Sequence, residues 1–340
     1  MALQYFEDYS LLAHNTFGID VRAKYFVTVS SEEEAKEALQ FAQARELSLL
    51  ILGGGSNVLF TEDFPGIVIQ NRIRGIEKVA EDESYVFIRA AAGENWHSFV
   101  MHCINEEWAG LENLSLIPGC VGASPMQNIG AYGVEISNVL DAVEAIHTKH
   151  LNHKRFTKEE CELGYRESIF KRKEKGNWFI THVVFKLNKR AVFHTEYGAI
   201  ADELDKMELD NLTIRDVSKA VVNIRSSKLP NPKELGNAGS FFKNPTVPIA
   251  VLRKIQTFDE KVPFYPVNDQ EVKIPAGYLI EQSGWKGKRV GNCGVHTKQA
   301  LVLVNYGESK GSDIFNLSSS IIEEIKQRYG ITLEREVNIL

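Results

Sequence analysis

The sequence predicts an α+β fold built in three successive zones. Helical and strand-like hydrophobic patterns follow one another without a low-complexity linker. Composition changes sharply in the last zone, because seven of the ten prolines lie between Pro230 and Pro275. We therefore place one boundary near residue 74 and another near residue 229.

The first zone, residues 1–73, has the pattern of a small β-α-β unit. Residues 25–29 predict a strand, and Ser31 with Glu34 predicts a capping box at the start of an amphipathic helix. Residues 49–52 predict a buried strand that ends in Gly53-Gly54-Gly55-Ser56-Asn57. Extended structure resumes at 58–60 and 67–69.

The other two zones are assigned from the same kinds of pattern. In residues 74–229 we expect strands at 76–79, 85–91, 139–146 and 179–187 and a helix at 96–108. In residues 230–329 we expect helices at 247–256, 276–282 and 313–329 and a strand at 301–304. Residues 331–337 alternate like a strand.

Composition narrows the class of protein. The chain has 340 residues, of which 44% are hydrophobic and 25% charged, and a formal charge of −6. These values exclude a disordered chain and a disulfide-dependent miniprotein, and they give no overall field for nucleic acid or an anionic membrane. No apolar stretch approaches the roughly 18 residues of a spanning helix, and the N-terminus lacks the basic region of a signal peptide. Four scattered cysteines without a Cys-x-x-Cys pair indicate reduced thiols in a cytoplasmic protein and no metal site.

Two glycine-rich segments are candidates for ligand binding. The loop Gly53–Gly55 leaves backbone N–H groups free to face an anion, but it fits neither a P-loop nor a Rossmann fingerprint. Taken alone, it is equally well explained as a tight turn. The segment from Pro118 to Gly133 is too irregular for a helix or a strand and too apolar for a surface loop. We expect its backbone, with Ser124, Gln127 and Asn128, to bind a pyrophosphate and a polar heterocycle.

Several polar residues stand in contexts that suggest chemistry, each with a plainer alternative. Ser240, between Gly239 and two phenylalanines, suits a proton donor in a flavin or carbonyl reaction, or is a turn serine. Arg166, next to Tyr165, suits carboxylate binding, or is a surface ion pair. Arg225 and Lys228 either bracket a diphosphate or end a basic helix. Glu336 is either a buried acid with a raised pKa or an edge-strand charge that points to water.

In this order along the chain, the motifs resemble those of the UDP-N-acetylenolpyruvoylglucosamine reductase (MurB) family, in its longer type with a tyrosine-bearing loop. The resemblance rests on six segments that cover nearly the whole chain: Asn15–Gly18, Gly53–Leu59, Ile117–Gly133, Gly164–Ser168, Gly236–Pro245 and Leu333–Val337. The sequence departs from the family pattern at Arg335, where proline is common, and at Asn338, where arginine is common.

The resemblance implies an FAD-binding fold of the vanillyl-alcohol-oxidase (PCMH) type. Residues 1–73 and 74–229 would form the two FAD-binding lobes, the second completed by segment 330–340, and residues 230–329 would form the lobe that binds a UDP-sugar. NADPH would pass a hydride to FAD, and flavin N5 would then pass it to the β-carbon of the enolpyruvyl ether. Ser56 stands where relatives with covalent flavin carry histidine, so we expect FAD without a covalent link.

The resemblance also implies roles for individual residues. Arg166 would bind the carboxylate and stabilise the developing charge, Ser240 would protonate the α-carbon, and Glu336 would help hold the enolic form. The UDP-sugar would be held by Tyr165, Tyr197, Arg225, Lys228, Asn244, Tyr265 and Gln299. FAD would be held by Gly53, Gly54, Gly55, Ser56, Asn57, Pro118, Gly119, Gly122, Ala123, Ser124, Gln127, Asn128, Gly130, Ala131 and Tyr132.

The hypothesis at this point is a cytoplasmic, monomeric, NADPH-dependent FAD reductase of peptidoglycan precursor synthesis, with no nucleic-acid or membrane partner. One alternative is a flavin oxidase acting on a sugar or hydroxy acid, which predicts rapid reoxidation of reduced flavin by oxygen. Another is a non-catalytic protein that binds nucleotide sugars, which would not need the trio Arg166, Ser240 and Glu336.

Overall fold

The computed structural model describes residues 3–340 and divides them into two compact units. Unit 1 comprises the chain up to Tyr9, Ala23–Gly54 and Phe64–Ser227. Unit 2 comprises Ser10–Arg22, Gly55–Asp63 and Lys228–Leu340. Helices and strands are mixed in both units, so the predicted α+β class is confirmed.

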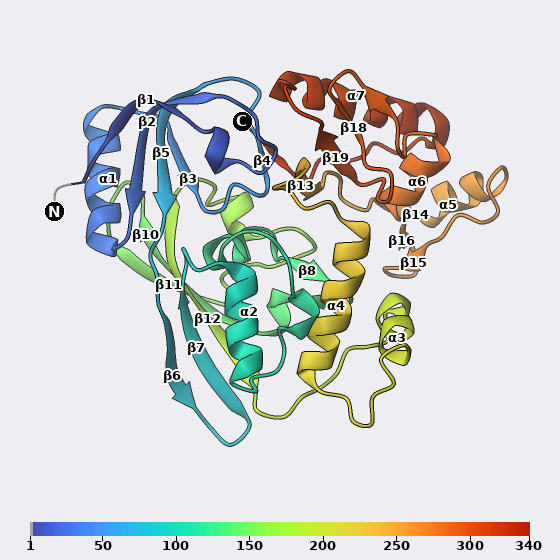
Figure 1. Cartoon of the computed structure of the whole chain (residues 1–340), viewed down its shortest axis with the longest axis horizontal. Coiled ribbons are helices and arrows are strands. Elements are labelled where there is room, and N and C mark those ends of the chain that lie inside the picture. The colour runs from blue at the N-terminus through green and yellow to red at the C-terminus, as the bar shows by residue number, and fades with distance from the viewer. Residues whose placement is uncertain (1–2) are drawn as a thin grey trace. The chain divides into compact units, whose positions relative to one another are not determined.

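Unit 1 contains two sheets, each covered by a helix (Figure 1). The first sheet has the order β1-β2-β5-β3, in which β2 and β3 both run parallel to β5. The second is antiparallel with the order β11-β10-β12-β7-β6. The strands are β1 (Phe6–Ser10), β2 (Arg22–Val29), β3 (Leu49–Leu52), β5 (Phe64–Asn71), β6 (Ile76–Glu81), β7 (Tyr85–Ala91), β10 (Leu140–His147), β11 (His153–Thr157) and β12 (Trp178–Asn188).

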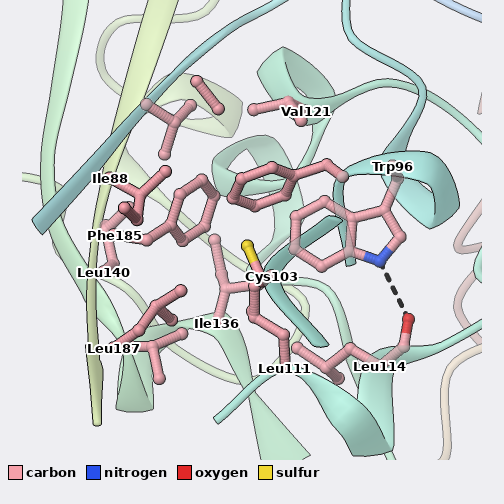
Figure 2. Close-up of a cluster of buried hydrophobic side chains, with 14 of the residues drawn as sticks. Ile88, Trp96, Cys103, Leu111, Leu114, Val121, Ile136, Leu140, Phe185 and Leu187 are labelled. Atoms are coloured by element: carbon pink, nitrogen blue, oxygen red, sulfur yellow. Dashed lines mark hydrogen bonds between the residues drawn. The ribbon is translucent and has the colours of Figure 1, made fainter. Parts of the chain in front are cut away.

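Helix α1 (Glu32–Ala44) places the apolar residues of its pattern in one buried cluster with β2 and β5. Ser31 caps it by accepting the N–H of Glu34 at 3.1 Å, while the Glu34 carboxylate accepts from Ser30 rather than from Ser31. Helix α2 (Trp96–Asn105) packs its apolar face against β7, β10 and β12 (Figure 2). It ends three residues before the predicted end, because Glu107 takes a left-handed conformation with φ 60°.

The core of unit 1 reaches the start of the predicted glycine-rich segment. In Figure 2 the indole of Trp96 lies among Phe185, Cys103 and Leu114, and its Nε1 donates to the Leu114 carbonyl at 2.9 Å. Trp96 is 1% exposed. This bond therefore ties α2 to the chain that leads into residues 116–133.

Two helices of unit 1 were not among the expected elements. They are α3 (Gly198–Asp205) and α4 (Ile214–Lys228). They pack together through a small cluster formed by Ile200, Val221 and Ile224. A short hairpin of β8 (Gly130–Ala131) and β9 (Val134–Glu135) completes the unit.

Unit 2 is built on an antiparallel sheet of order β13-β19-β18-β17, with helix α7 packed on β18 and β19. A second sheet has the order β14-β16-β15, and β4 pairs with β20 in parallel. The strands are β4 (Val58–Leu59), β13 (Gly236–Ser240), β14 (Thr246–Pro248), β15 (Tyr265–Pro266), β16 (Glu271–Lys273), β17 (Arg289–Val290), β18 (Cys293–Val295), β19 (Val302–Asn305) and β20 (Asn338–Ile339). The helices are α5 (Ile249–Gln256), α6 (Ala276–Gln282) and α7 (Gly311–Tyr329).

The C-terminal segment differs from its prediction. Residues 331–337 form no continuous strand, and their single bridge joins Arg335 to Phe242. Pro245, which has no amide hydrogen, follows the partner segment closely and cannot donate to a longer ladder. The strand that does form, β20, pairs with β4 of unit 2 rather than with a strand of residues 74–229. The division into three lobes otherwise stays a prediction.

Candidate active site

The two glycine-rich segments are packed directly on each other within unit 1. A methyl group added to Gly54 would lie 3.2 Å from the Cα of Gly119, and one added to Gly53 would lie 3.4 Å from Cys120 Cβ. A side chain on Gly54 would have to shift the other segment by a few tenths of an ångström, while one on Gly53 would lie in ordinary contact with it. The division between the two units falls inside the first loop, after Gly54.

The segment from Gly119 to Gly122 is hydrogen-bonded to the rest of unit 1 and is not a free surface loop. We call this segment, together with Gly53 and Gly54, the glycine-rich edge of unit 1. Its backbone bonds to the chain before α2: Gly119 accepts from Trp96, Val121 donates to Glu94 and Gly122 donates to Ala92, at 2.9 to 3.0 Å. Val121 is buried, while Ile117, Met126 and Ile129 pack on the same core. The expectation that these apolar residues are shielded from solvent is confirmed for Val121 and met in part by the other three, which are half-buried.

One polar atom of this segment is buried without a partner. The Ser124 hydroxyl, on a residue that is 1% exposed, has no hydrogen-bond partner among residues 3–340. Buried polar atoms are nearly always hydrogen-bonded, so an orphan in a glycine-rich segment indicates a missing polar ligand. Asn128, by contrast, is buried and fully engaged with Glu135, the Gly164 carbonyl and the Ser137 N–H. Asn128 therefore shapes the segment through protein contacts.

Arg166 stands at the tip of a two-residue turn. Gly164 and Glu167 exchange backbone hydrogen bonds at 3.0 and 3.1 Å across it, and Arg166 has φ 55°, a conformation that glycine adopts more easily. Its Nη2 donates to the Gly130 carbonyl at 2.7 Å. The structure thus brings Arg166 to the predicted cofactor segment, and the strained backbone is typical of functional positions.

Glu135 is a member of this cluster that sequence reasoning missed. Its Oε1 lies 3.9 Å from Arg166 Nη1, and its Oε2 accepts from Asn128 Nδ2 at 2.7 Å. It lies 31 positions before Arg166 in the chain, and no local pattern marks it. Only the β8–β9 hairpin places it there.

A second group in unit 1 contains two of the predicted nucleotide-binding residues. Arg225, on α4, donates to the Leu116 carbonyl at 3.2 Å, and it also hydrogen-bonds the Tyr132 side chain. Burial lowers the pKa of Arg225 and raises that of Tyr132. The rings of Tyr132 and Tyr197 meet edge to face at 5.5 Å, although Tyr197 is half exposed. Arg225 is therefore a half-buried residue in the last turn of α4 that bonds to other parts of unit 1, while Lys228, the last residue of the helix, is exposed.

Ser240 and Glu336 lie on adjacent backbone segments of unit 2. Ser240 ends β13, and the next residue, Phe241, accepts the N–H of Glu336 at 2.8 Å. The Glu336 carbonyl in turn accepts from Asn57 Nδ2 at 3.4 Å. Both residues are half-buried, and the neighbouring rings of Phe241 and Phe242 are fully buried. A hydroxyl and a carboxyl from positions nearly 100 residues apart are thus held on adjacent backbone segments.

The segment Asn15–Gly18 supports β13 through hydrogen bonds and close packing. Asn237 donates its N–H to the Thr16 carbonyl at 3.0 Å, and Thr16 Oγ1 donates to the Asn237 carbonyl at 2.6 Å. Gly236 has no room for a side chain, because a methyl group there would lie 2.2 Å from the Phe17 carbonyl. These contacts fix the strand that carries Ser240.

Asn244 and Gln299 border the first turn of α6. Asn244 Oδ1 accepts the N–H of Ala276 at 2.9 Å, and a methyl group on Gly277 would lie 3.5 Å from Gln299 Oε1. Lys228 and Tyr265 are exposed, Tyr265 at 57%.

Within residues 3–340 no cluster of His, Cys, Asp and Glu could hold a metal ion, and no helix is both long and apolar enough to cross a bilayer.

Comparison with known proteins agrees with this architecture. Residues 23–149 match the family described as "FAD binding domain", and residues 231–340 match "UDP-N-acetylenolpyruvoylglucosamine reductase, C-terminal domain". A reductase of that name from Flavobacterium johnsoniae is 48% identical, with 98% of each chain covered, and one from Pseudomonas savastanoi pv. phaseolicola is 47% identical over the whole of both chains. The crystal structure of the Thermus caldophilus reductase has the same fold, with a TM-score of 0.66 at 24% identity over 100% of this chain and 99% of that one.

The FAD-binding match and the glycine-rich edge of unit 1 define the class: the chain is an FAD-dependent oxidoreductase, as the sequence predicted. At this level of identity over the full length, the chain belongs to the UDP-N-acetylenolpyruvoylglucosamine reductase family. The predicted family is therefore confirmed. The roles of the individual site residues stay predictions.

Proposed function

We propose that this chain reduces the enolpyruvyl group of UDP-N-acetylglucosamine enolpyruvate to give UDP-N-acetylmuramate, a step of peptidoglycan precursor synthesis. The names of its relatives and their coverage of the entire chain support this substrate. FAD, when bound, supplies the hydride that it has received from NADPH. We further propose that the FAD is held without a covalent link and that the enzyme acts as a monomer in the cytoplasm.

The observation that carries the proposal is that Ser240 and Glu336 lie on adjacent backbone segments. Hydride addition to the β-carbon of an enol ether leaves negative charge on the α-carbon and its carboxylate, and a proton must then reach the α-carbon. The Ser240 hydroxyl is the proton donor in this proposal. The Glu336 carboxyl stabilises the enolic form, and the hydrogen bond from Glu336 N–H to the Phe241 carbonyl keeps the two side chains on adjacent segments.

Arg166 binds the substrate carboxylate in this proposal. Its guanidinium donates to the Gly130 carbonyl and lies 3.9 Å from the Glu135 carboxylate, so its position is fixed by the protein. A preorganised cation of this kind stabilises charge that develops during the reaction. We assign Tyr165, Tyr197, Arg225, Lys228, Asn244, Tyr265 and Gln299 to the UDP-sugar.

FAD is assigned to the Gly53–Asn57 loop and to the segment from Pro118 to Tyr132. The orphaned hydroxyl of Ser124 fits a large polar ligand on this edge of unit 1, where Gly54 and Gly122 let the protein's own segments pack closely. Gly53, Gly54, Gly119 and Gly122 let the backbone approach such a ligand, and Ser124 donates a hydrogen bond to it.

The test is an anaerobic spectroscopic titration of the purified yellow protein. NADPH should bleach the flavin absorbance, and the enolpyruvyl sugar should then restore it with formation of one equivalent of UDP-N-acetylmuramate. Restoration by oxygen together with turnover of a sugar or hydroxy acid would instead indicate an oxidase. Binding of the nucleotide sugar without any restoration would indicate a non-catalytic protein.

A further inference from the structure

Arg335, the residue before Glu336, is held by helix α7. Its Nε donates to Ser318 Oγ at 2.8 Å, and its Nη2 donates to Ser319 Oγ at 2.7 Å. The guanidinium carbon also lies 4.5 Å from the centre of the Phe315 ring. The arginine thus makes two directed hydrogen bonds and a cation–π contact with one turn of the helix.

The two serines are oriented to accept these bonds. Ser318 Oγ donates to the Phe315 carbonyl at 2.6 Å, and Ser319 Oγ donates to the same carbonyl at 3.0 Å. A hydroxyl has one hydrogen, so each oxygen presents only lone pairs to the guanidinium. Phe315 therefore supplies both the carbonyl that orients the hydroxyls and the ring that covers the cation.

Arg335 is not engaged in an ion pair within residues 3–340. Its hydrogen-bonding partners are the two hydroxyls, and burial lowers its pKa. Placing a cation among neutral groups costs desolvation energy that no carboxylate offsets here. The arrangement is therefore better explained by a need for a fixed position than by charge pairing.

The hydrogen bonds between Arg335 and α7 bear on the direction in which the Glu336 side chain points. Segment 334–336 is extended: Arg335 bridges to Phe242, Glu336 N–H donates to the Phe241 carbonyl, and Lys243 N–H donates to the Glu334 carbonyl. Successive side chains of an extended segment point to opposite faces, so an arginine directed at α7 turns the next side chain away from α7. A shift of segment 334–336 by one residue along its partner would point the Glu336 side chain toward α7 instead. A single β-bridge specifies this register only weakly.

We propose that Arg335 is a positioning residue for the reduction: its bonds to Ser318 and Ser319 set the register of segment 334–337 and so orient the Glu336 carboxyl. This inference rests on the role proposed above for Glu336. Arg335 has no direct contact with substrate in this account.

The experiment measures the two half-reactions separately by stopped flow in four single variants and one double variant. Arg335→Met keeps the length of the side chain but removes its donors, and it should slow flavin reoxidation by the enolpyruvyl sugar at least about tenfold. Arg335→Lys should lose less, because one donor remains. Flavin reduction by NADPH should stay within about twofold in both. Arg328→Met is the matched control, since Arg328 lies on α7 itself and donates to the Gln282 carbonyl at 2.6 Å, and the rates of both half-reactions should be unchanged.

The fourth variant, Glu336→Gln, separates positioning from a merely structural role. If Arg335 acts through Glu336, adding Arg335→Met to Glu336→Gln should slow reoxidation by less than about twofold more. The same tenfold loss in both backgrounds, or no loss from Arg335→Met alone, would overturn the inference while leaving the role of Glu336 intact. No effect of Glu336→Gln by itself would overturn both.

Discussion

Gly122→Ala tests whether the glycine-rich edge of unit 1 is as tightly packed as its geometry indicates. The added methyl group would lie 2.4 Å from Ala92 Cβ and 3.1 Å from the Ala92 Cα and carbonyl oxygen. Carbon atoms in contact are normally about 3.5–4.0 Å apart, so one segment has to move by about 1 Å. That movement also strains the 2.9 Å bond from Gly122 N–H to the Ala92 carbonyl. Overpacking of this kind costs about 1–3 kcal/mol.

The assay is urea unfolding of the holoprotein, followed by tryptophan and flavin fluorescence. We expect the free energy of unfolding to fall by about 2 kcal/mol and FAD to be released at lower urea. Gly198→Ala is the control: it lies at the start of α3 with no atom within 4 Å of the added methyl group, and we expect it to be neutral or stabilising by up to about 1 kcal/mol. A Gly122→Ala protein as stable as the wild type, with unchanged FAD affinity, would refute the reasoning.

Two further predictions concern the chain that leads into this edge. Trp96→Phe leaves the buried Leu114 carbonyl without its donor and removes part of the indole volume, so the free energy of unfolding in urea should fall by about 2–4 kcal/mol. Trp178→Phe is the control and should cost less, because the Trp178 indole bonds the partly exposed Glu174. Equal losses in the two variants would contradict the account. His97 Nδ1 accepts the Leu116 N–H at 3.0 Å, and burial, reinforced by Arg225, lowers the pKa of His97. The unfolded chain therefore binds this proton at higher pH than the folded one, so the free energy of unfolding should fall as pH drops below about 6.5. His97→Asn should reduce that dependence between pH 7.5 and 5, and an unchanged slope would contradict the assignment.

Local patterns predicted many elements because they depend on neighbouring residues alone. The bounds of β7 and α6 agree with the predicted ranges 85–91 and 276–282. Helix α4 was missed although its buried residues, including Val217, Val221 and Ile224, recur at helical spacing. The alternation at 331–337 correctly predicted an extended segment. Whether such a segment forms a β-ladder depends on the residues of the strand opposite it, and the local pattern contains no information about that strand.

The candidate site was predictable only in part for the same reason. The resemblance to the reductase family selected Ser240 and Glu336, whereas nothing local indicates that residues 241 and 336 share a hydrogen bond. Arg335 and Ser318 are a similar case, since their contact joins α7 to a segment that follows it by several residues. Glu135 was found only from the structure, because its approach to Arg166 depends on how a hairpin folds back.

The most direct test of the central claim is stopped-flow measurement of both half-reactions in Ser240→Ala. If Ser240 donates the proton to the α-carbon, flavin reduction by NADPH should stay within about twofold of the wild type, while reoxidation by the enolpyruvyl sugar should fall about 100-fold or more. Ser320→Ala, an exposed serine on α7, should leave both rates unchanged. Equal losses in the two half-reactions of Ser240→Ala, or no loss in the second, would contradict the account.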